Sequence, residues 1–433
     1  MSLFGSSGIR RIADRNLIEI ALRAGLALGR LHKRVVVGRD TRTSGGALKH
    51  ALVSGLLSSG ARCYDGGVLP TPTLAVAARD FDIGVMLTAS HNPPEYNGIK
   101  IFNPDGSSFV SAQQQELERM ITNPSPAAPW DRVEPDCIRL EAAIERHIEH
   151  IMAQTGATAT KKTRVVVDCA CGAGAVITPV LLRKLNCEVI GLNTNTSGFF
   201  PHDVEPIERN LQDLIRICGE LRAFGIAHDG DADRMMAVDE EGRFIPGDKM
   251  LVLLARHIQA RDVVTTVDAS IIVEESGFKT TRTRVGDTYV SEQLSNSGDF
   301  GGEPSGAWIF PRNSLCPDGI FAAATLVSIA ATEKLSDLVD AIPQYCVLRG
   351  SLDLSQRKTD DEELISKTQP LSVDGTDGLK LLFDDGWALV RPSGTEPKIR
   401  LTVEAKSDAR AHQIYDRVLH AMGTEMPQGG QSS

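Results

Sequence analysis

The sequence predicts an α/β protein with three related α/β domains and a smaller α+β domain at the carboxy terminus, arranged around a central cleft. Runs of β-branched residues alternate with segments whose apolar residues recur at helical spacing. The chain has 433 residues, too many for one ordinary domain. The alternation occurs in three rounds and then gives way to a different pattern. We expect domains over residues 1–134, 135–238, 239–350 and 351–433.

The first round opens with a helix and ends at a proline-rich boundary. Buried parallel strands read as continuous apolar runs, and RVVVGRD and DIGVMLTAS have this character. The second of these predicted strands ends at Ser90. Helices are predicted over Leu17–Arg30, Ala47–Ser59 and Gln113–Ile121. The stretch TNPSPAAPWDRVEP then marks a boundary, because proline continues neither helices nor strands.

The second and third rounds repeat this order. Strands are predicted in RVVVDCACGAGA, CEVIGLN, FGIAHDGDADRMMAVDEEG and VVTTVDAS, the third of them interrupted by an acidic loop. Helices are predicted over Val176–Leu185, Leu211–Arg222, Lys249–Gln259 and Phe321–Ala330. The last domain differs, because LKLLFDDGWALVR has a hairpin turn signal and IRLTVEAKS adds another strand before the helix Asp408–Met422.

Composition excludes several classes of protein. The formal net charge is −10, from 46 Lys and Arg against 56 Asp and Glu, so a basic surface for nucleic acid or an anionic membrane is not expected. No apolar run approaches the roughly 20 residues that span a bilayer, and the amino terminus lacks a signal-peptide core. We therefore expect a cytoplasmic protein. The eight cysteines are scattered without zinc-site spacing, and His147 and His150 are interpreted as part of a solvated helix face.

The acidic loop HDGDADR is the sharpest local signal. Asp229, Asp231 and Asp233 place carboxylates on alternate residues, where they can converge on one hard cation. An EF-hand loop needs glycine at its sixth position, but Arg234 stands there. A solvated acidic turn is the plain alternative, although three close carboxylates repel one another without a cation among them. An arginine beside such a site can clamp phosphate oxygens, so the loop predicts Mg²⁺ bridging to a phosphate.

A second segment, TASHNPPEYNGIK, follows a predicted buried strand. Open α/β sheets place ligands beyond the ends of their strands, and Ser90 lies there. No G-x-S-x-G elbow surrounds Ser90, so a serine hydrolase is not indicated. A serine that carries a phosphate and binds Mg²⁺ through it needs no triad. Lys100 can transfer a proton if cationic neighbours lower its pKa. Taken alone, the segment is equally well explained as a structural turn.

Two further loops carry polar groups suited to a sugar phosphate. In GGEPSG, Glu303 and Ser305 offer hydrogen-bonding groups suited to vicinal sugar hydroxyls. In RPSGTEPKIR, a phosphate dianion would be held by Arg391, Ser393, the backbone near Gly394 and Thr395. Each loop is also explained by an ordinary turn.

Together and in this order, the four loops resemble those of the α-D-phosphohexomutase superfamily. TASHNPPEYNGIK is similar to its phosphoserine loop, DGDADR to its metal loop, GGEPSG to its sugar loop and RPSGTEP to its phosphate loop. FGSSGIRR looks like its amino-terminal loop, with Arg10 as a phosphate contact. The resemblance covers essentially the whole chain and implies the four-domain architecture.

The resemblance also implies a mechanism. Phosphoserine at Ser90 would donate its phosphate to a hexose phosphate, giving a hexose 1,6-bisphosphate that reorients and returns the other phosphate. Mg²⁺ would be held by the three aspartates and the Ser90 phosphate, and His91 and Lys100 would be candidates for proton transfer. The implied partner is a hexose phosphate bound by a monomer or homodimer, with no nucleic acid and no membrane.

Departures from the family pattern bear on the sugar. Many relatives have histidine after the sugar-loop Ser-Gly, where this chain has Ala307, and the loop residue after Glu303 is Pro304. GGEPSG with VDAS and RVGDTYV resembles archaeal members, which favours glucosamine phosphate, with mannose or glucose phosphate as the alternative. A metal-dependent sugar phosphatase would not need a second phosphate cradle. A non-catalytic sensor should have lost Ser90 or an aspartate of the metal loop.

Overall fold

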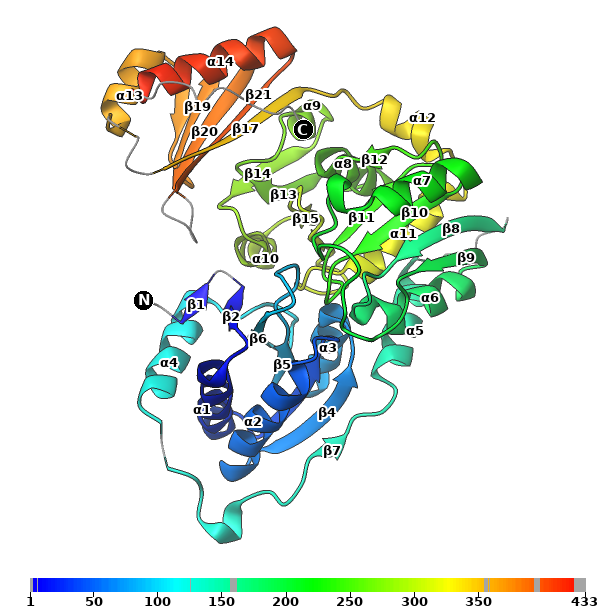
Figure 1. Ribbon diagram of the computed structural model, residues 1–433, viewed down its shortest axis with the longest axis vertical. Coiled ribbons are helices and arrows are strands. Elements are labelled where there is room, and N and C mark those ends of the chain that lie inside the picture. Colours follow the sequence, from blue (N-terminus) through cyan, green and yellow to red (C-terminus); the bar gives the residue numbers. More distant parts are fainter. Residues whose placement is uncertain are drawn as a thin grey trace. The chain divides into compact units, whose positions relative to one another are not determined.

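The structure is a computed structural model that describes residues 3–5, 7–124, 126–155, 162–353, 357, 359–392 and 398–423. These residues form four sheets flanked by helices, which confirms the α/β class (Figure 1). Contacts group the chain into two compact units. The first runs through Val264 and resumes over Gly286–Ala341, and the second contains Thr265–Val285 and the chain from Ile342.

The first sheet has the order β1-β2-β6-β5-β3-β4-β7. Its central strands β5, β3 and β4 are parallel, and β6 continues the sheet antiparallel to β5. The strands are β1 (Phe4–Gly5), β2 (Gly8–Ile12), β3 (Arg34–Arg39), β4 (Arg62–Val68), β5 (Ile83–Leu87), β6 (Tyr96–Phe102) and β7 (Ile138–Arg139). The helices are α1 (Arg15–Leu31), α2 (Gly45–Ser58), α3 (Thr71–Ala77) and α4 (Ser111–Thr122), with 3₁₀ turns η1 (Ala78–Asp80) and η2 (Trp130–Arg132).

Helices α1 and α2 cross at a pair of glycines. A Cβ at Gly25 would lie 2.1 Å from the Leu52 carbonyl oxygen, and one at Gly55 would lie 2.2 Å from that of Leu22. The two backbones therefore touch where any larger residue would separate them. This close crossing supports the buried face of the first sheet, whose core includes Val35, Val37 and residues of both helices.

The second sheet has the order β12-β11-β10-β8-β9, with β10, β8 and β9 parallel. The strands are β8 (Thr163–Asp168), β9 (Cys187–Leu192), β10 (Phe224–His228), β11 (Met235–Val238) and β12 (Phe244–Ile245). The helices are α5 (Ala143–Thr155), α6 (Thr178–Lys184) and α7 (Gln212–Leu221), with η3 (Ala173–Val176) and η4 (Glu208–Asn210). On α5 the sequence interpretation is wrong for His147, which is fully buried and paired with Asp318 at 3.1 Å, because α5 packs against neighbouring helices.

The third sheet has the order β14-β13-β15-β16, and the fourth is antiparallel with the order β17-β21-β20-β19-β18. The third contains β13 (Asp262–Thr266), β14 (Lys279–Thr283), β15 (Phe300–Gly302) and β16 (Trp308–Ile309), with α8 (Gly247–His257), α9 (Ile272–Glu275), α10 (Asp287–Asn296), α11 (Gly319–Ala330) and α12 (Leu335–Asp340). The fourth contains β17 (Cys346–Asp353), β18 (Ser372–Asp374), β19 (Leu379–Phe383), β20 (Gly386–Pro392) and β21 (Lys398–Ala405). Helices α13 (Asp361–Thr368) and α14 (Asp408–Ala421) cover one face of this sheet (Figure 1).

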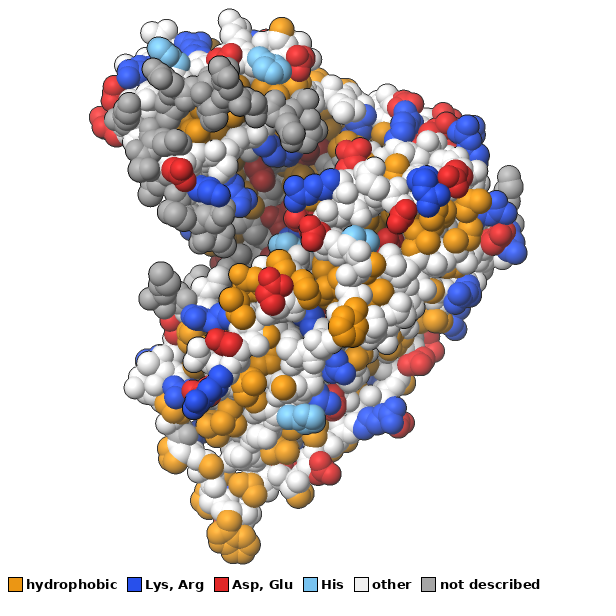
Figure 2. Space-filling view, viewed as in Figure 1, with side chains coloured by type: hydrophobic (Ala, Val, Ile, Leu, Met, Phe, Trp, Pro, Cys, Tyr) orange, Lys and Arg blue, Asp and Glu red, His pale blue; other side chains and the backbone are white. Residues whose placement is uncertain are grey.

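The surface carries charges of both signs. On the face shown in Figure 2, acidic and basic side chains are interspersed. Among the described residues, none of the helices combines the length and apolar character that a membrane crossing requires.

Candidate active site

The acidic loop connects β10 to β11, two neighbouring strands of the second sheet. Asp229 and Asp231 are fully buried and Asp233 is 5% exposed. One carboxylate oxygen from each lies within 4.8 Å of the others. The alternate spacing in the sequence thus brings the three side chains together, as predicted, because the loop turns back between two antiparallel strands.

These three carboxylates fit a hard cation. Asp231 Oδ2 accepts hydrogen bonds from Thr71 Oγ1 at 2.5 Å and Lys100 Nζ at 2.9 Å, whereas its Oδ1 is buried with no hydrogen-bond partner among the described residues. Burial and the neighbouring Asp233 and Asp231 raise the pKa of Asp229. An unpartnered carboxylate oxygen inside a repelling cluster is what a divalent cation with oxygen ligands would satisfy. The triad could therefore hold a metal ion.

Ser90 lies directly against this cluster. It follows β5, is 1% exposed and has a φ of 52°, a conformation that a non-glycine residue adopts at a cost. Its Oγ donates a hydrogen bond of 2.6 Å to Asp229 Oδ2. Two loops that are more than a hundred residues apart in the chain thus meet, so that a phosphate on Ser90 would share a cation with the triad.

Lys100 and His91 border the same cluster, and their surroundings shift their pKa values in opposite directions. Lys100 Nζ lies 2.9 Å from Asp231 and 2.5 Å from Asp233. Burial alone would lower the pKa of Lys100, but these two aspartates raise it above its usual range, so the expected lowering by cationic neighbours is not found. Arg234, burial and Arg10 hold the pKa of His91 well below its usual range. Its Nδ1 lies 3.3 Å from Ser90 Oγ.

Two arginines extend the positive side of the site. Arg10 lies on β2 and its Nη1 donates to Asn92 Oδ1 at 3.3 Å, within the loop that carries Ser90. Arg234 is mostly buried, and its Nη1 lies 3.6 Å from Glu205 Oε1. Both guanidinium groups lower the pKa of His91, the residue that follows Ser90. They are suited to hold phosphate oxygens.

The sugar loop forms the tip of the β15–β16 hairpin and lies beside the metal loop. Ala307 forms a bridge with Arg234, and Met235 N donates to Gly306 O at 2.9 Å. Glu303 is 7% exposed and its Oε1 accepts from Gly286 N at 2.9 Å. Ser305 Oγ is buried without a hydrogen-bond partner in the described part of the chain. The predicted sugar-binding residues therefore lie next to Arg234, the neighbour of the triad.

The phosphate loop of the last domain is only partly described. Arg391 lies on β20 and its Nε pairs with Asp377 Oδ2 at 3.1 Å. Ser393, Gly394 and Thr395 lie outside the described residues. Their assignment remains a prediction.

Sequence reasoning missed Thr71 and the buried pair Asp40–Arg42. Thr71 begins α3 and touches Asp231, a contact that no local pattern signals. Asp40 and Arg42 belong to GRDTR, which directly follows a predicted buried strand. Open α/β sheets bind ligands beyond their strand ends, so this position was the one feature of the sequence that could have indicated a role at the site.

The buried Ser90 loop, the buried aspartate cluster and the β15–β16 hairpin lie together on an α/β scaffold, the arrangement expected of a phosphosugar mutase. The chain belongs to the phosphoglucomutase/phosphomannomutase family, within the α-D-phosphohexomutase superfamily. Family models described as its α/β/α domains I, II and III match residues 1–127, 145–242 and 246–345, and that of its C-terminal domain matches 354–421.

Individual proteins of known name show which members of the family this chain is similar to. A protein of Methanocella arvoryzae named "Probable phosphoglucosamine mutase" is 46% identical, over 96% of this chain and 97% of that one. The phosphoglucosamine mutase of Methanococcus aeolicus is 40% identical, over 96% of this chain and 97% of that one. The crystal structure of a phosphoglucomutase/phosphomannomutase family protein from Burkholderia thailandensis superposes with a TM-score of 0.84 at 28% identity and covers 99% of this chain and 98% of that one.

Proposed function

We propose that this phosphohexomutase interconverts glucosamine 6-phosphate and glucosamine 1-phosphate through a phosphoserine at Ser90. The supporting observation is the 2.6 Å contact between Ser90 Oγ and the buried aspartate cluster, in a chain whose relatives are named phosphoglucosamine mutases. Mannose and glucose phosphates are the alternative substrates.

Each half-reaction moves one phosphoryl group. A sugar hydroxyl attacks the phosphorus on Ser90, the bond to Ser90 Oγ breaks, and the hydroxyl proton leaves to a base. The resulting hexose 1,6-bisphosphate reorients, and Ser90 Oγ takes back the other phosphoryl group. By the family resemblance, His91 and Lys100 are the candidates for the proton transfers, and Arg10 and Arg234 contact phosphate oxygens.

Mg²⁺ held by Asp229, Asp231, Asp233 and the Ser90 phosphate would supply positive charge to the transferring group. Glu303 and Ser305 would hold sugar hydroxyls. Arg391, Ser393, Gly394 and Thr395 would hold the phosphate that is not reacting. The domain boundaries near residues 134, 238 and 350, the cytoplasmic location and a monomer or homodimer remain predictions.

The test is an assay of the purified chain with Mg²⁺ on glucosamine, mannose and glucose 6-phosphates, each with a trace of the matching 1,6-bisphosphate. We expect the highest kcat/KM on glucosamine 6-phosphate and a phosphate mapped to the Ser90 peptide by mass spectrometry. Ser90→Ala should abolish turnover, while Ser295→Ala, an exposed serine on α10, serves as the matched control. Highest activity on mannose or glucose phosphate would overturn the sugar assignment, and full turnover by Ser90→Ala would overturn the mechanism.

A further inference from the structure

The segment after β3 carries a buried ion pair to which the proposed function assigns no role. Asp40 is fully buried, Arg42 is 1% exposed, and Arg42 Nε lies 3.1 Å from Asp40 Oδ2. Burying two charges is costly unless every donor and acceptor is satisfied. The contacts of this pair therefore indicate what it is for.

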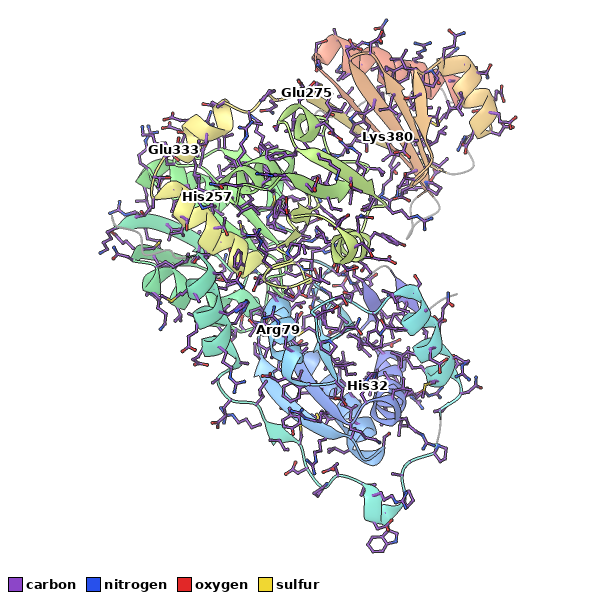
Figure 3. The ribbon with its side chains drawn as sticks, turned by 180° about the vertical axis from the view of Figure 1, so that it is seen from behind. His32, Arg79, His257, Glu275, Glu333 and Lys380 are labelled. Carbon is purple, nitrogen blue, oxygen red and sulfur yellow. The ribbon has the colours of Figure 1, made fainter. Side chains whose placement is uncertain are left out.

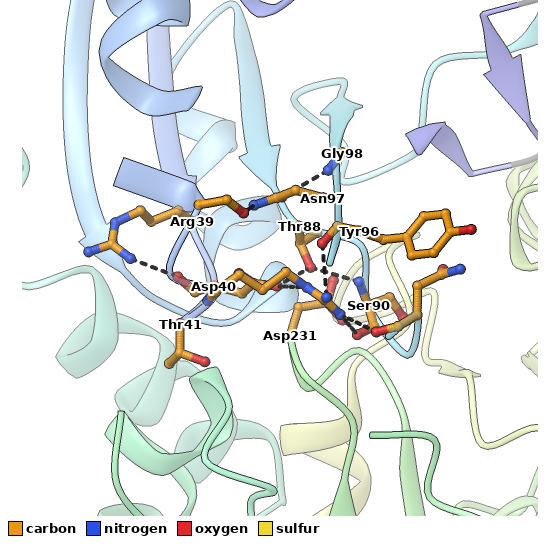
Figure 4. A network of polar contacts seen from close by, with 12 residues as sticks. Arg39, Asp40, Thr41, Thr88, Ser90, Tyr96, Asn97, Gly98 and Asp231 are labelled. Carbon is orange, nitrogen blue, oxygen red and sulfur yellow. Dashed lines mark hydrogen bonds and ion pairs between the residues drawn. The ribbon is translucent and has the colours of Figure 1, made fainter. Parts of the chain in front are cut away.

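The Arg42 guanidinium donates its hydrogen bonds to the backbone of the Ser90 loop. Figure 4 shows the polar network in which Asp40, Thr88 and Ser90 lie. Its two terminal nitrogens donate to the carbonyl oxygens of Ser90 at 2.8 Å, Asn92 at 2.7 Å, Pro93 at 2.6 Å and Tyr96 at 3.0 Å. A guanidinium has five N–H donors. Four of them bind this one loop and the fifth binds Asp40, so none is left over.

The same pair also holds the other side of Ser90. Ser90 N donates to Thr88 Oγ1 at 2.8 Å, and Thr88 Oγ1 donates to Asp40 Oδ2 at 2.7 Å. The N–H and the C=O of Ser90 are thus both tied to one ion pair. Fixing both peptide groups fixes the direction of the Cα–Cβ bond, and with it the left-handed conformation of Ser90.

A loop of the second domain covers this arrangement. The Phe200 ring lies 5.1 Å from the Arg42 guanidinium carbon. Gly198 approaches so closely that a Cβ there would lie 2.1 Å from Thr41 O. Water is thereby kept from the guanidinium, and hydrogen bonds are stronger in such a dry environment.

We propose that Arg42, paired with Asp40, is the positioning residue that directs Ser90 Oγ at Asp229 for both phosphoryl transfers. The inference rests on the proposed function and concerns how its nucleophile is held. Ser90 Oγ must lie in line with the phosphorus in two half-reactions, and a displacement of about 1 Å can reduce the rate on the order of a hundredfold. Lysine keeps the charge but has no planar fork to reach four carbonyls.

The test compares Arg42→Lys with Arg282→Lys. Arg282 also donates to a run of backbone carbonyls, those of Thr266, Ala269 and Ser270, but not to the Ser90 loop. For each variant one measures Tm, the fraction phosphorylated by intact mass, the ³¹P spectrum of the phosphoserine, and kcat and KM per folded, phosphorylated molecule. We expect Arg42→Lys to lower kcat on the order of a hundredfold with KM within about threefold, and to shift or broaden the ³¹P line. Arg282→Lys should lower Tm and leave kcat, KM and the ³¹P line unchanged.

A second variant tests the proposal even where Arg42→Lys fails to fold. Thr88→Val is nearly isosteric and breaks only the link from Ser90 N to Asp40, so we expect kcat to fall about tenfold at unchanged KM. Equal kcat in Arg42→Lys and Arg282→Lys, or unchanged kcat in Thr88→Val, would overturn the positioning role. Failure of the proposed function is distinguishable, because the unmodified chain would then show no mutase turnover, whereas failure of the positioning role leaves the unmodified chain and both variants equally active.

Discussion

At the scale of single residues, Asp231 shows how the acidic cluster is balanced. One of its oxygens accepts two hydrogen bonds, from Thr71 and Lys100, and the other is buried without any from the described residues. A buried polar atom left unpaired costs about 1–3 kcal/mol. A bound cation would remove that cost, so metal binding should be coupled to the free energy of unfolding.

We expect Mg²⁺ to raise the Tm of the chain, because an ion that binds only the folded state stabilises it. At a free concentration of about 100 times Kd the gain is about 2.7 kcal/mol. Asp231→Asn should lose this response together with most of the activity. Differential scanning calorimetry at increasing Mg²⁺ measures the effect, with Asp213→Asn on the exposed face of α7 as control. An undiminished Tm response in Asp231→Asn would place the metal elsewhere.

At the scale of elements, the predicted strands are those with continuous apolar runs. β3, β5, β8 and β10 are interior strands whose apolar residues are all buried, and the apolar runs in their sequences predict this. The predicted helix Leu17–Arg30 is α1, Arg15–Leu31, and its N-cap Asp14 accepts from Leu17 N.

Short edge elements escaped prediction for a physical reason. β12 and β16 have two residues each, too few for a periodic pattern, and they form because neighbouring strands offer free hydrogen-bonding groups. Strand order escaped too: β6 lies between β2 and β5 through contacts that no local sequence encodes.

Strand β19 carries a buried lysine whose ionisation should make stability depend on pH. Lys380 lies on the fourth sheet (Figure 3), 4.2 Å from the centre of the Trp387 ring, and its Nζ donates to Val267 O at 2.5 Å. These contacts favour the ammonium form, but burial, with Arg282 nearby, lowers its pKa to about 7. Between pH 7 and the ordinary lysine pKa of about 10.4, the unfolded chain binds more protons than the folded one.

We therefore expect the free energy of unfolding to rise with pH from about 7 to 10, by at most about 1.4 kcal/mol per pH unit for this one proton. Below pH 7 both states are protonated and the contribution of Lys380 is constant. Urea unfolding between pH 6.5 and 9.5 measures the slope, and Lys380→Met should flatten it relative to Lys367→Met on the exposed face of α13. Equal slopes in the two variants would show that Lys380 is not the titrating group.

At the scale of the whole molecule, sequence order predicted that distant loops would meet, and in the first compact unit three of them do. Ser90, Asp229 and the sugar loop come together because each follows a strand end or a hairpin tip, positions that a sequence can mark. What holds the domains of that unit together was not predictable. His147 looked like part of a polar helix face because its partners lie 74 and 171 residues away.

His147 joins three separate elements in the interior of the first unit. Its Nδ1 lies 2.9 Å from Thr73 Oγ1 on α3, and its Nε2 lies 3.1 Å from Asp318 Oδ2. Asp318 caps α11 by accepting from Ile320 N and Phe321 N. Helix α5 thereby connects the first sheet's α3 with the third domain's α11, and the His147 and Asp318 side chains are both fully buried.

Breaking this buried pair should separate the unfolding of these domains. His147→Phe keeps the volume but removes the buried contacts of the imidazole with Thr73 and Asp318, and loss of a buried hydrogen-bonding partner costs about 1–3 kcal/mol. His150→Phe on the same helix removes a half-exposed histidine and should cost far less.

Because His147 ties α3 and α5 to α11, we expect urea unfolding of His147→Phe to show an earlier transition and a lower apparent m-value as cooperativity is lost. Asp318→Asn added to His147→Phe should cost less than the two single changes summed, since the contact between the two side chains is already lost. Strict additivity in this double-mutant cycle, or identical transitions in His147→Phe and His150→Phe, would show that α5 is held by apolar packing alone.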